Sequence, residues 1–253
     1  MSDLTINLHL GDCLPLLAHF PTGHFDALIT DPPYSSGGMF RGDRMDTTND
    51  KYMNTESAGL HADFQGDNRD QRAWAFWCVM WLSECRRVLA PGAPALMFTD
   101  WRQLPTATDV FQAAGFVWRG IAVWDKTESV RPQMGRFRAQ AEYIVWGSNG
   151  PMPLTRPVPV LPGVYQHIVR QDDKHHVTGK PTPLLRDLAR ICVPGGHILD
   201  PFMGSGTTGV AAIQSGYSFT GIELDPHYYD IARGRCQQTI QEVPCNLPLL
   251  QSD

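Results

Sequence analysis

The sequence contains no apolar run of about 18 residues, the length that a membrane-spanning helix needs. Its start, Met1-Ser2-Asp3-Leu4, carries an acid and lacks the basic and apolar regions of a secretory signal. The 23 Gly and 20 Pro are scattered without a period, which excludes collagen-like and low-complexity chains. We therefore expect a protein that has no membrane partner and is located in the cytoplasm.

Closely spaced cysteine pairs are also missing. None of the six cysteines is spaced as C-x-x-C, and no Cys/His set resembles a zinc site. Free, mostly buried thiols in a reducing compartment are the simplest interpretation, and we expect no metal.

The chain as a whole also lacks an excess of positive charge, because its net charge is −5. Taken alone, this net charge argues against a nucleic-acid partner. The distribution differs from the total, since residues 119–180 contain 9 Lys+Arg against 5 Asp+Glu. Arg131, Arg136 and Arg138 form the most basic part of this segment, with Gly135 and Phe137 between them. Such a stretch can be a solvated face, and it favours phosphate binding only if nearby chemistry requires DNA.

Short apolar runs alternate with amphipathic stretches, which predicts an α/β fold with helices on both faces of a sheet. With 253 residues, 42% of them hydrophobic, we expect a single domain over 1–253. The expected strands are 6–10, 27–30, 95–99, 120–124, 142–146, 197–199 and 218–222. The expected helices are 71–88, 106–114, 183–191, 207–214 and 226–238.

Two long stretches, 35–70 and 147–176, fit no regular element; the first is polar and the second contains five prolines. The helix over 71–88 places Trp74, Trp77 and Trp81 on one face, and a core-facing stripe is the preferred interpretation over a base-stacking surface.

A glycine-rich turn follows the strand over 197–199. Gly204 and Gly206 allow the backbone to turn tightly and to approach a ligand, and Thr207 can cap the next helix. The following strand ends at Glu223, which can accept two ribose hydroxyls. The G-x-G-x-x-G spacing fits either NAD or S-adenosylmethionine.

Two residues that precede these glycines favour S-adenosylmethionine over NAD. Asp200 and Phe202 place an acid and a bulky ring at the tip of the strand. A carboxylate there repels a pyrophosphate but attracts the cationic amino group of an amino-acid-bearing cofactor.

The most informative stretch is the tetrad Asp31-Pro32-Pro33-Tyr34, which follows the strand over 27–30. The carboxyl ends of strands are where open α/β sheets bind ligands. The Asp31 carboxylate and the Pro32 carbonyl can together accept both hydrogens of an exocyclic amine. Tyr34 can stack on the ring that bears this amine.

The tetrad and the segment Asp200-Pro-Phe-Met-Gly-Ser-Gly206 together resemble the amino-group DNA methyltransferases, which act on adenine N6 or cytosine N4. The tetrad precedes the glycine turn, as in the permuted beta group. Further segments resemble motifs of that family, and they cover most of the chain: Leu10-Gly11-Asp12, Arg87–Gly92, Val123–Lys126, Glu142–Val145, His176–Pro181 and Gly221–Tyr229.

The resemblance implies a mixed seven-stranded sheet with one antiparallel strand, in which 218–222, 197–199 and 27–30 are central neighbours and 6–10 lies at the edge. It implies S-adenosylmethionine as cofactor, with Asp12 at the adenine amine, Glu223 at the ribose and Lys180 at the carboxylate. The cofactor-binding residues that it suggests are Asp12, Asp31, Lys180, Asp200, Phe202, Gly204, Gly206, Thr207 and Glu223.

The expected reaction is methyl transfer to DNA after the target base is flipped out of a duplex. Asp31, Pro32 and Tyr34 would be catalytic. Residues expected at the base or at the DNA are Pro33, Trp124 (as a second wall of the base pocket), Arg131, Arg136 and Arg138. The 147–176 stretch is a candidate for a short target-recognition region, and a homodimer is compatible with the resembled group.

An initial Asp in the tetrad favours adenine N6, with cytosine N4 as the alternative. Two alternatives come from other classes: an NAD-dependent oxidoreductase built on the glycine turn, and a catalytically silent DNA-binding module. The 35–70 insert stays unassigned.

Overall fold

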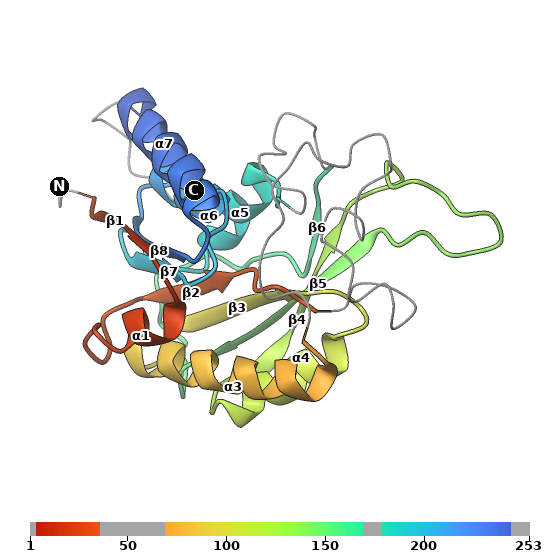
Figure 1. The fold of residues 1–253 in the computed structure, drawn as a ribbon, viewed down its shortest axis with the longest axis horizontal. Coiled ribbons are helices and arrows are strands. Elements are labelled where there is room, and N and C mark those ends of the chain that lie inside the picture. The colour runs from red at the N-terminus through yellow and green to blue at the C-terminus, as the bar shows by residue number, and fades with distance from the viewer. Residues whose placement is uncertain (1–3, 36–68, 169–178, 244–253) are drawn as a thin grey trace.

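A computed structural model describes residues 4–35, 69–168 and 179–243 (Figure 1). The strands are β1 (Ile6–Leu10), β2 (Ala27–Thr30), β3 (Pro94–Thr99), β4 (Val117–Asp125), β5 (Ala141–Ser148), β6 (Val164–Gln166), β7 (His197–Asp200) and β8 (Ser218–Glu223). The helices are α1 (Cys13–Leu17), α3 (Gln71–Val88), α4 (Leu104–Ala113), α5 (Thr182–Ala189), α6 (Thr207–Gln214) and α7 (Pro226–Glu242).

The strands of the described residues form one mixed sheet in the order β1-β8-β7-β2-β3-β5-β4-β6. As predicted, β8, β7 and β2 are central neighbours and β1 lies at the edge. Only β5 in this sheet runs against its neighbours, which confirms the single antiparallel strand. The prediction of seven strands was wrong, because the three-residue β6 adds an eighth beside β4.

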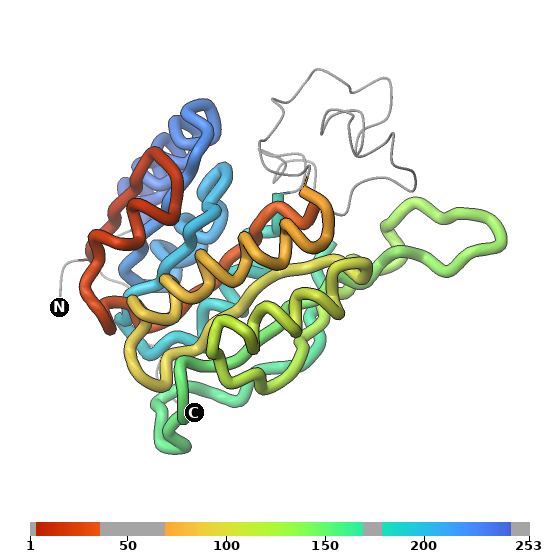
Figure 2. Tube along the Cα trace, turned by 60° about the horizontal axis from the view of Figure 1, so that its bottom comes forward, coloured from red at the N-terminus to blue at the C-terminus, as the bar shows by residue number. Residues whose placement is uncertain are grey.

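Helices cover both faces of the sheet, as its apolar strands require. Every residue of β2 and β3 is buried. Alternate residues of β2 pack on opposite sides: Leu28 joins a core with α1, α3 and α4, whereas Ala27 and Ile29 join one with α5, α6 and α7. Figure 2 shows α3 and α4 side by side on the first of these faces.

Helix α3 begins and ends where its sequence predicts. The Asp70 carboxylate accepts hydrogen bonds from the backbone N–H groups of Arg72 and Ala73, which caps the first turn. Trp74 and Trp81 are fully buried and Trp77 is half-buried, so the tryptophan stripe faces the core as expected. Five cysteines are described, all free and buried, and Cys245 lies outside the described residues.

The two stretches expected to be irregular are only partly described. Of 35–70, the structure describes the first residue and the last two. The 147–176 stretch is described as far as residue 168; it includes the end of β5 and the whole of β6, so its expected lack of regular structure was wrong there. No helix among the described residues is long and apolar enough to cross a membrane.

Two tryptophans of α3 give a matched test of what ties this helix to the sheet. The indole N–H of Trp74 donates to the Pro33 carbonyl at 2.8 Å, whereas that of Trp81 has no oxygen or nitrogen acceptor among the described residues. Trp74→Phe leaves the Pro33 carbonyl without its donor, whereas Trp81→Phe leaves no carbonyl without a donor. We expect Trp74→Phe to lower the free energy of unfolding by about 1–3 kcal/mol more than Trp81→Phe does, measured by urea denaturation. Equal losses would show that the bond to Pro33 contributes nothing.

Candidate functional site

The tetrad and the glycine turn meet because β2 and β7 are parallel neighbours, so that their carboxyl ends lie at the same edge of the sheet. A hydrogen bond links the two ends: the Thr30 hydroxyl donates to Asp200 Oδ1 at 2.8 Å. Segments 170 residues apart in the sequence therefore form one site.

The glycine turn depends on backbone conformations that favour glycine. Gly204 and Gly206 have φ angles of 52° and 81°, and a Cβ at Gly206 would lie 2.8 Å from the Ala232 Cβ of α7. Gly206 is itself the N-cap of α6, so the capping role predicted for Thr207 was wrong. The Thr207 hydroxyl instead accepts a hydrogen bond at 3.1 Å from Arg235, which also binds the Ser205 carbonyl and so fastens the turn to α7.

Glu223 closes the turn from the neighbouring strand. Its carboxylate accepts hydrogen bonds from the N–H of Gly204 at 2.9 Å and of Asp225 at 2.8 Å, and burial raises its pKa. Each oxygen keeps a second lone pair that can accept a ribose hydroxyl. The exposed Asp12 lies at the end of the adjacent β1, where its side chain caps α1 through the N–H of Leu14.

This arrangement disfavours a dinucleotide. A dinucleotide-binding turn directs backbone N–H groups at a pyrophosphate, but here the N–H of Gly204 donates to Glu223 and that of Gly206 to the Met203 carbonyl. The carboxylate of Glu223, which accepts from the N–H groups of Gly204 and Asp225, adds negative charge to the same turn.

Asp200 lies beneath the turn. It is 2% exposed, and its Oδ1 accepts hydrogen bonds from the Thr30 hydroxyl and from the N–H of Phe202. Burial raises the pKa of its carboxyl to about 7. The ring of Phe202 packs against Trp77 and Trp81 of α3, at centroid distances of 5.3 and 4.9 Å.

The backbone of the tetrad is held from two sides. The Pro33 carbonyl accepts from Trp74, and the Tyr34 carbonyl accepts from the Gln103 side chain at 2.9 Å. The Pro32 carbonyl receives no hydrogen bond from the part of the chain that the structure describes, as its predicted role as an acceptor requires.

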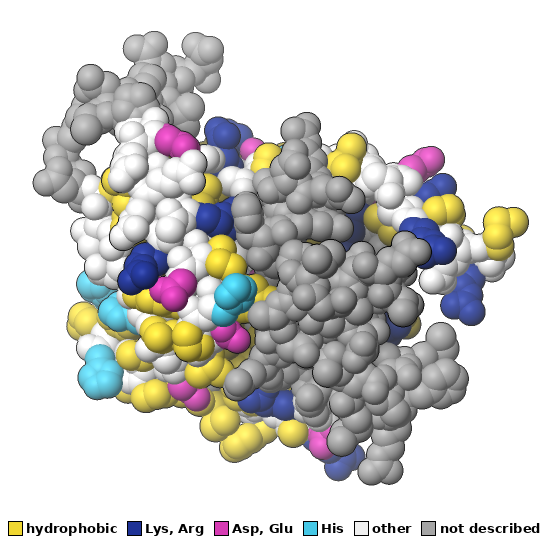
Figure 3. Space-filling view, turned by 45° about the horizontal axis from the view of Figure 1, so that its top comes forward, with side chains coloured by type: hydrophobic (Ala, Val, Ile, Leu, Met, Phe, Trp, Pro, Cys, Tyr) yellow, Lys and Arg dark blue, Asp and Glu magenta, His cyan; other side chains and the backbone are white. Residues whose placement is uncertain are grey.

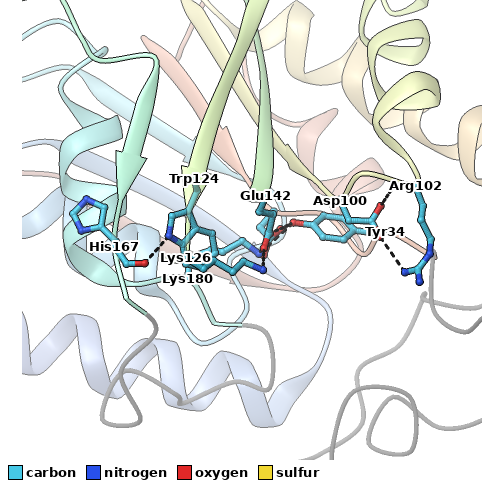
Figure 4. A network of polar contacts seen from close by, with 9 residues as sticks. Tyr34, Asp100, Arg102, Trp124, Lys126, Glu142, His167 and Lys180 are labelled. Carbon is cyan, nitrogen blue, oxygen red and sulfur yellow. Dashed lines mark hydrogen bonds and ion pairs between the residues drawn. The ribbon is translucent and has the colours of Figure 1, made fainter. Parts of the chain in front are cut away.

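The tetrad side chains enter a charged network that contains two carboxylates and two lysines (Figure 4). The Tyr34 hydroxyl lies 2.5 Å from Asp31 Oδ1 and 2.7 Å from Glu142 Oε1. Lys180 Nζ lies 2.7 Å from Asp31 Oδ2 and 2.7 Å from Glu142 Oε1. Lys126 Nζ reaches Glu142 Oε2, also at 2.7 Å.

Mutual pairing sets the protonation of this network. Burial alone would raise the pKa of Glu142, but Lys180 and Lys126 outweigh it and hold that pKa at about 2. Burial and the neighbouring Glu142 raise the pKa of Asp31 against the opposing pull of Lys180. Burial and the two carboxylates raise the pKa of Tyr34, so its hydroxyl stays neutral. That hydroxyl has one hydrogen, which it can donate to only one carboxylate at a time.

Sequence reasoning did not single out Glu142 as a site residue. The signal available was a short motif, Glu142–Val145, whose first residue is the second residue of β5, an antiparallel strand two places from β2. Lys180 was expected at a cofactor carboxylate; in this structure it pairs with Asp31 and Glu142.

The residues expected to contact the DNA or the target base differ in their exposure. Trp124 is 2% exposed and donates to the His167 carbonyl, so it presents no open ring face to a base in this structure, and its expected place in a base pocket stays a prediction. The three arginines lie on the loop that joins β4 and β5, and all are exposed. Arg138 also braces this loop, because its Nη1 donates to the carbonyls of Glu128 and Val130. Among the described residues, no three His, Cys, Asp or Glu side chains are grouped as metal ligands.

Comparison with known sequences finds a family match over most of the chain. The model of the family described as DNA methylase, the N6/N4 methyltransferases, matches residues 25–234. The chain is 32% identical over 241 residues to the "Putative methylase YubD" of Escherichia coli (strain K12), covering 93% of each protein. It is 26% identical over 275 residues to the type II methyltransferase M.HinfI of Haemophilus influenzae, covering 99% of this chain and 73% of that protein.

Solved structures share the fold. The DNA modification methylase TTHA0409 of Thermus thermophilus, named as putative and complexed with S-adenosyl-L-methionine, superposes with a TM-score of 0.68 at 20% identity, covering 93% of this chain and 94% of that one. The cytosine-N4-specific PvuII DNA methyltransferase superposes with a TM-score of 0.68 at 17% identity, covering 94% and 92%.

The raised pKa of Asp200 predicts a pH-dependent cost of folding. Its carboxyl titrates at about 7 when folded, against an ordinary value of 3.8. The folded state therefore holds a proton that the unfolded chain has lost, and stability falls as the pH rises from about 4 to 7. Asp200→Asn removes this titration. We expect the variant to gain stability relative to the wild type between pH 5 and pH 8, on the order of a few kcal/mol, in chemical denaturation.

Asp125→Asn is the matched control. Hydrogen bonds from the Thr127 N–H and the Gln166 side chain lower the pKa of Asp125. It is ionised at both pH values in both states, so its variant should differ from the wild type by the same amount at pH 5 and pH 8. If the free energies of unfolding of Asp200→Asn and the wild type differed by the same amount at pH 5 and pH 8, the prediction would be contradicted.

Proposed function

Because the chain belongs to the N6/N4 family of DNA methylases, we propose that it transfers a methyl group from S-adenosylmethionine to the exocyclic N6 of adenine in DNA. The observation that carries this proposal is the direct link between the two halves of the site. An amine-binding tetrad and a cofactor-type glycine turn are joined through the Thr30–Asp200 hydrogen bond. The order of the two motifs in the chain supports placement in the beta group.

The residues at the turn fit S-adenosylmethionine. Glu223 would accept the ribose hydroxyls, Asp12 the adenine amine, and the carboxylate of Asp200 would attract the cationic amino group. Phe202, Gly204, Gly206 and Thr207 would surround the methionine part. Lys180 would meet the cofactor carboxylate, which would weaken its pairing with Asp31 Oδ2 and leave that oxygen available to the amine, while Oδ1 keeps its contact with the Tyr34 hydroxyl.

S-adenosylmethionine supplies a methyl group activated by a positively charged sulfur. The protein's contribution is to position the nucleophile: Asp31 and the Pro32 carbonyl accept the two amine hydrogens and direct the nitrogen lone pair out of the plane of the base. The new N–C bond forms as the S–C bond breaks, and the nitrogen releases one proton toward Asp31. The Tyr34 ring stacks on the base, fixed through its hydroxyl by Asp31 and Glu142.

Adenine is preferred over cytosine because the tetrad begins with Asp, which in the resembled family favours adenine N6. Cytosine N4 is the second candidate, since the cytosine-N4-specific PvuII enzyme shares the fold. In either case the base would be flipped from duplex DNA, with Arg131 and Arg136 on phosphates and Pro33 at the base. The 147–176 stretch is our candidate for target recognition.

The decisive experiment is nucleoside analysis by mass spectrometry of duplex DNA treated with the protein and S-adenosylmethionine. We expect N6-methyladenine. N4-methylcytosine would keep the mechanism and change the base. No methylated nucleoside would refute the proposal, and binding of a nicotinamide dinucleotide in calorimetry would favour the oxidoreductase instead.

Asp31→Ala separates binding from transfer. Glu142 still pairs with Lys180 in this variant, so the fold should persist, and calorimetry with S-adenosylmethionine measures cofactor binding separately from transfer. We expect methyl transfer to fall by about 10²-fold or more, because the amine loses its orienting acceptor. A variant that keeps the wild-type rate of methyl transfer would exclude Asp31 from the reaction. If the wild type itself transfers no methyl group, the silent DNA-binding module would be favoured.

Glu142→Gln tests the electrostatic coupling within the network. The Glu142 charge raises the pKa of Asp31, so removal of that charge lowers it. If ionised Asp31 is the active form, the acid limb of the kcat–pH profile should move to lower pH. Asp109→Asn, at an exposed position on α4, should leave the profile unchanged. A shift to higher pH would contradict the assignment.

A further inference from the structure

The loop of residues 126–140 between β4 and β5 projects from the body of the protein as a long hairpin (Figure 1). A tight turn forms its tip, in which the Arg136 N–H donates to the Gln133 carbonyl at 3.1 Å and Gly135 has a φ of 72°. Two large apolar side chains lie at this tip, Met134 within the turn and Phe137 directly after it, and they are 98% and 102% exposed. Both side chains therefore lack an apolar contact within the described chain.

Hydrogen bonds along its length hold the hairpin in shape. Arg138 joins the two arms by donating to the carbonyls of Glu128 and Val130. At the base of the hairpin, Asp125 accepts from the Thr127 N–H and from the Gln140 side chain. A braced loop presents its tip side chains in a defined place, which distinguishes it from an unstructured tail.

The charge of the hairpin is complementary to a polyanion. Residues 126–140 carry Lys126 and three arginines against one acid, Glu128. Figure 3 shows Lys and Arg side chains beside hydrophobic ones on this projecting segment. Arginine side chains next to exposed apolar side chains suit a DNA duplex, whose phosphates surround a stack of apolar base faces.

The hairpin is also rooted in the site. Lys126 at its start pairs with Glu142, which lies just beyond its end and contacts the Tyr34 hydroxyl. With roughly seven residues per arm at about 3.3 Å each, the tip can extend at most about 23 Å from this root. The grooves of DNA are about 8 Å deep, so the hairpin is long enough to reach the base stack.

We propose that Phe137, assisted by Met134, is a wedge that enters the base stack of duplex DNA and fills the space that the target base leaves when it flips out. Arg131 and Arg136 hold the adjacent phosphates. This inference rests on the proposed function, and it assigns the opening of the duplex to the hairpin and the chemistry to the tetrad. Because such a wedge offsets the cost of unstacking, it matters only where the target base starts inside a paired stack.

The test compares Phe137→Ala with the wild type on three substrates. These are duplex plasmid DNA, the same DNA heat-denatured, and duplex DNA with abasic sites opposite adenines, made by partial uracil substitution and base excision. We expect methyl incorporation into intact duplex to fall by about tenfold to a hundredfold, the range for withdrawing one Phe side chain from apolar contact. On the other two substrates the rate of Phe137→Ala should be within about threefold of the wild-type rate.

Phe76→Ala is the matched control, since Phe76 is 69% exposed but lies on α3, outside the hairpin, and it should leave all three rates unchanged. Wild-type rates for Phe137→Ala on intact duplex would overturn the wedge while leaving the proposed function in place. An equal deficit on all three substrates would also overturn it, because it would indicate general substrate binding. If the wild type methylates none of these DNAs, the proposed function fails and the wedge fails with it.

Discussion

The pairing of a buried ammonium with two carboxylates is the interaction on which the site depends. Lys180 is 5% exposed, and a lysine in that position requires compensation, because an unpaired charge removed from water costs several kcal/mol. Asp31 and Glu142 supply it at 2.7 Å each. The three residues come from the end of β2, the start of β5 and the segment before α5, so the pairing fixes three parts of the chain against one another.

The same edge of the sheet also collects the cofactor-type residues, for a topological reason. The carboxyl ends of β1, β8, β7 and β2 lie side by side because these strands are parallel and adjacent. Glu223 and Asp200 are the last residues of β8 and β7, and the tetrad follows the end of β2. One rule about strand direction therefore accounts for residues that are far apart in the sequence.

Much of this could be predicted from the sequence, because it depends on local patterns. The apolar runs predicted β1 and β2 at their observed bounds, and the glycine turn appeared where a strand gives way to a helix. The helical period placed Trp74 and Trp81 in the core. The family resemblance then supplied the order of the central strands, which composition and periodicity do not contain.

The remaining features depend on contacts between distant segments. β6 has three residues and exists only because β4 offers it an edge. Gly206, with a left-handed backbone, is the N-cap of α6, so Thr207 is the first helical residue and not the cap. The importance of Glu142 is invisible until β5 is known to lie two strands from β2, and Trp124 is buried by packing that its own segment does not predict.

The single reversed strand has an architectural consequence. Parallel strands must be joined by long crossovers, whereas antiparallel neighbours can be joined directly. Because β5 is antiparallel to β4, the loop of residues 126–140 joins them directly, at the edge of the sheet that bears the tetrad. A loop of this kind can grow or shrink between relatives without moving either strand. The loop between β4 and β5 can therefore change in length, while the carboxylate of Asp31 after β2 stays in place.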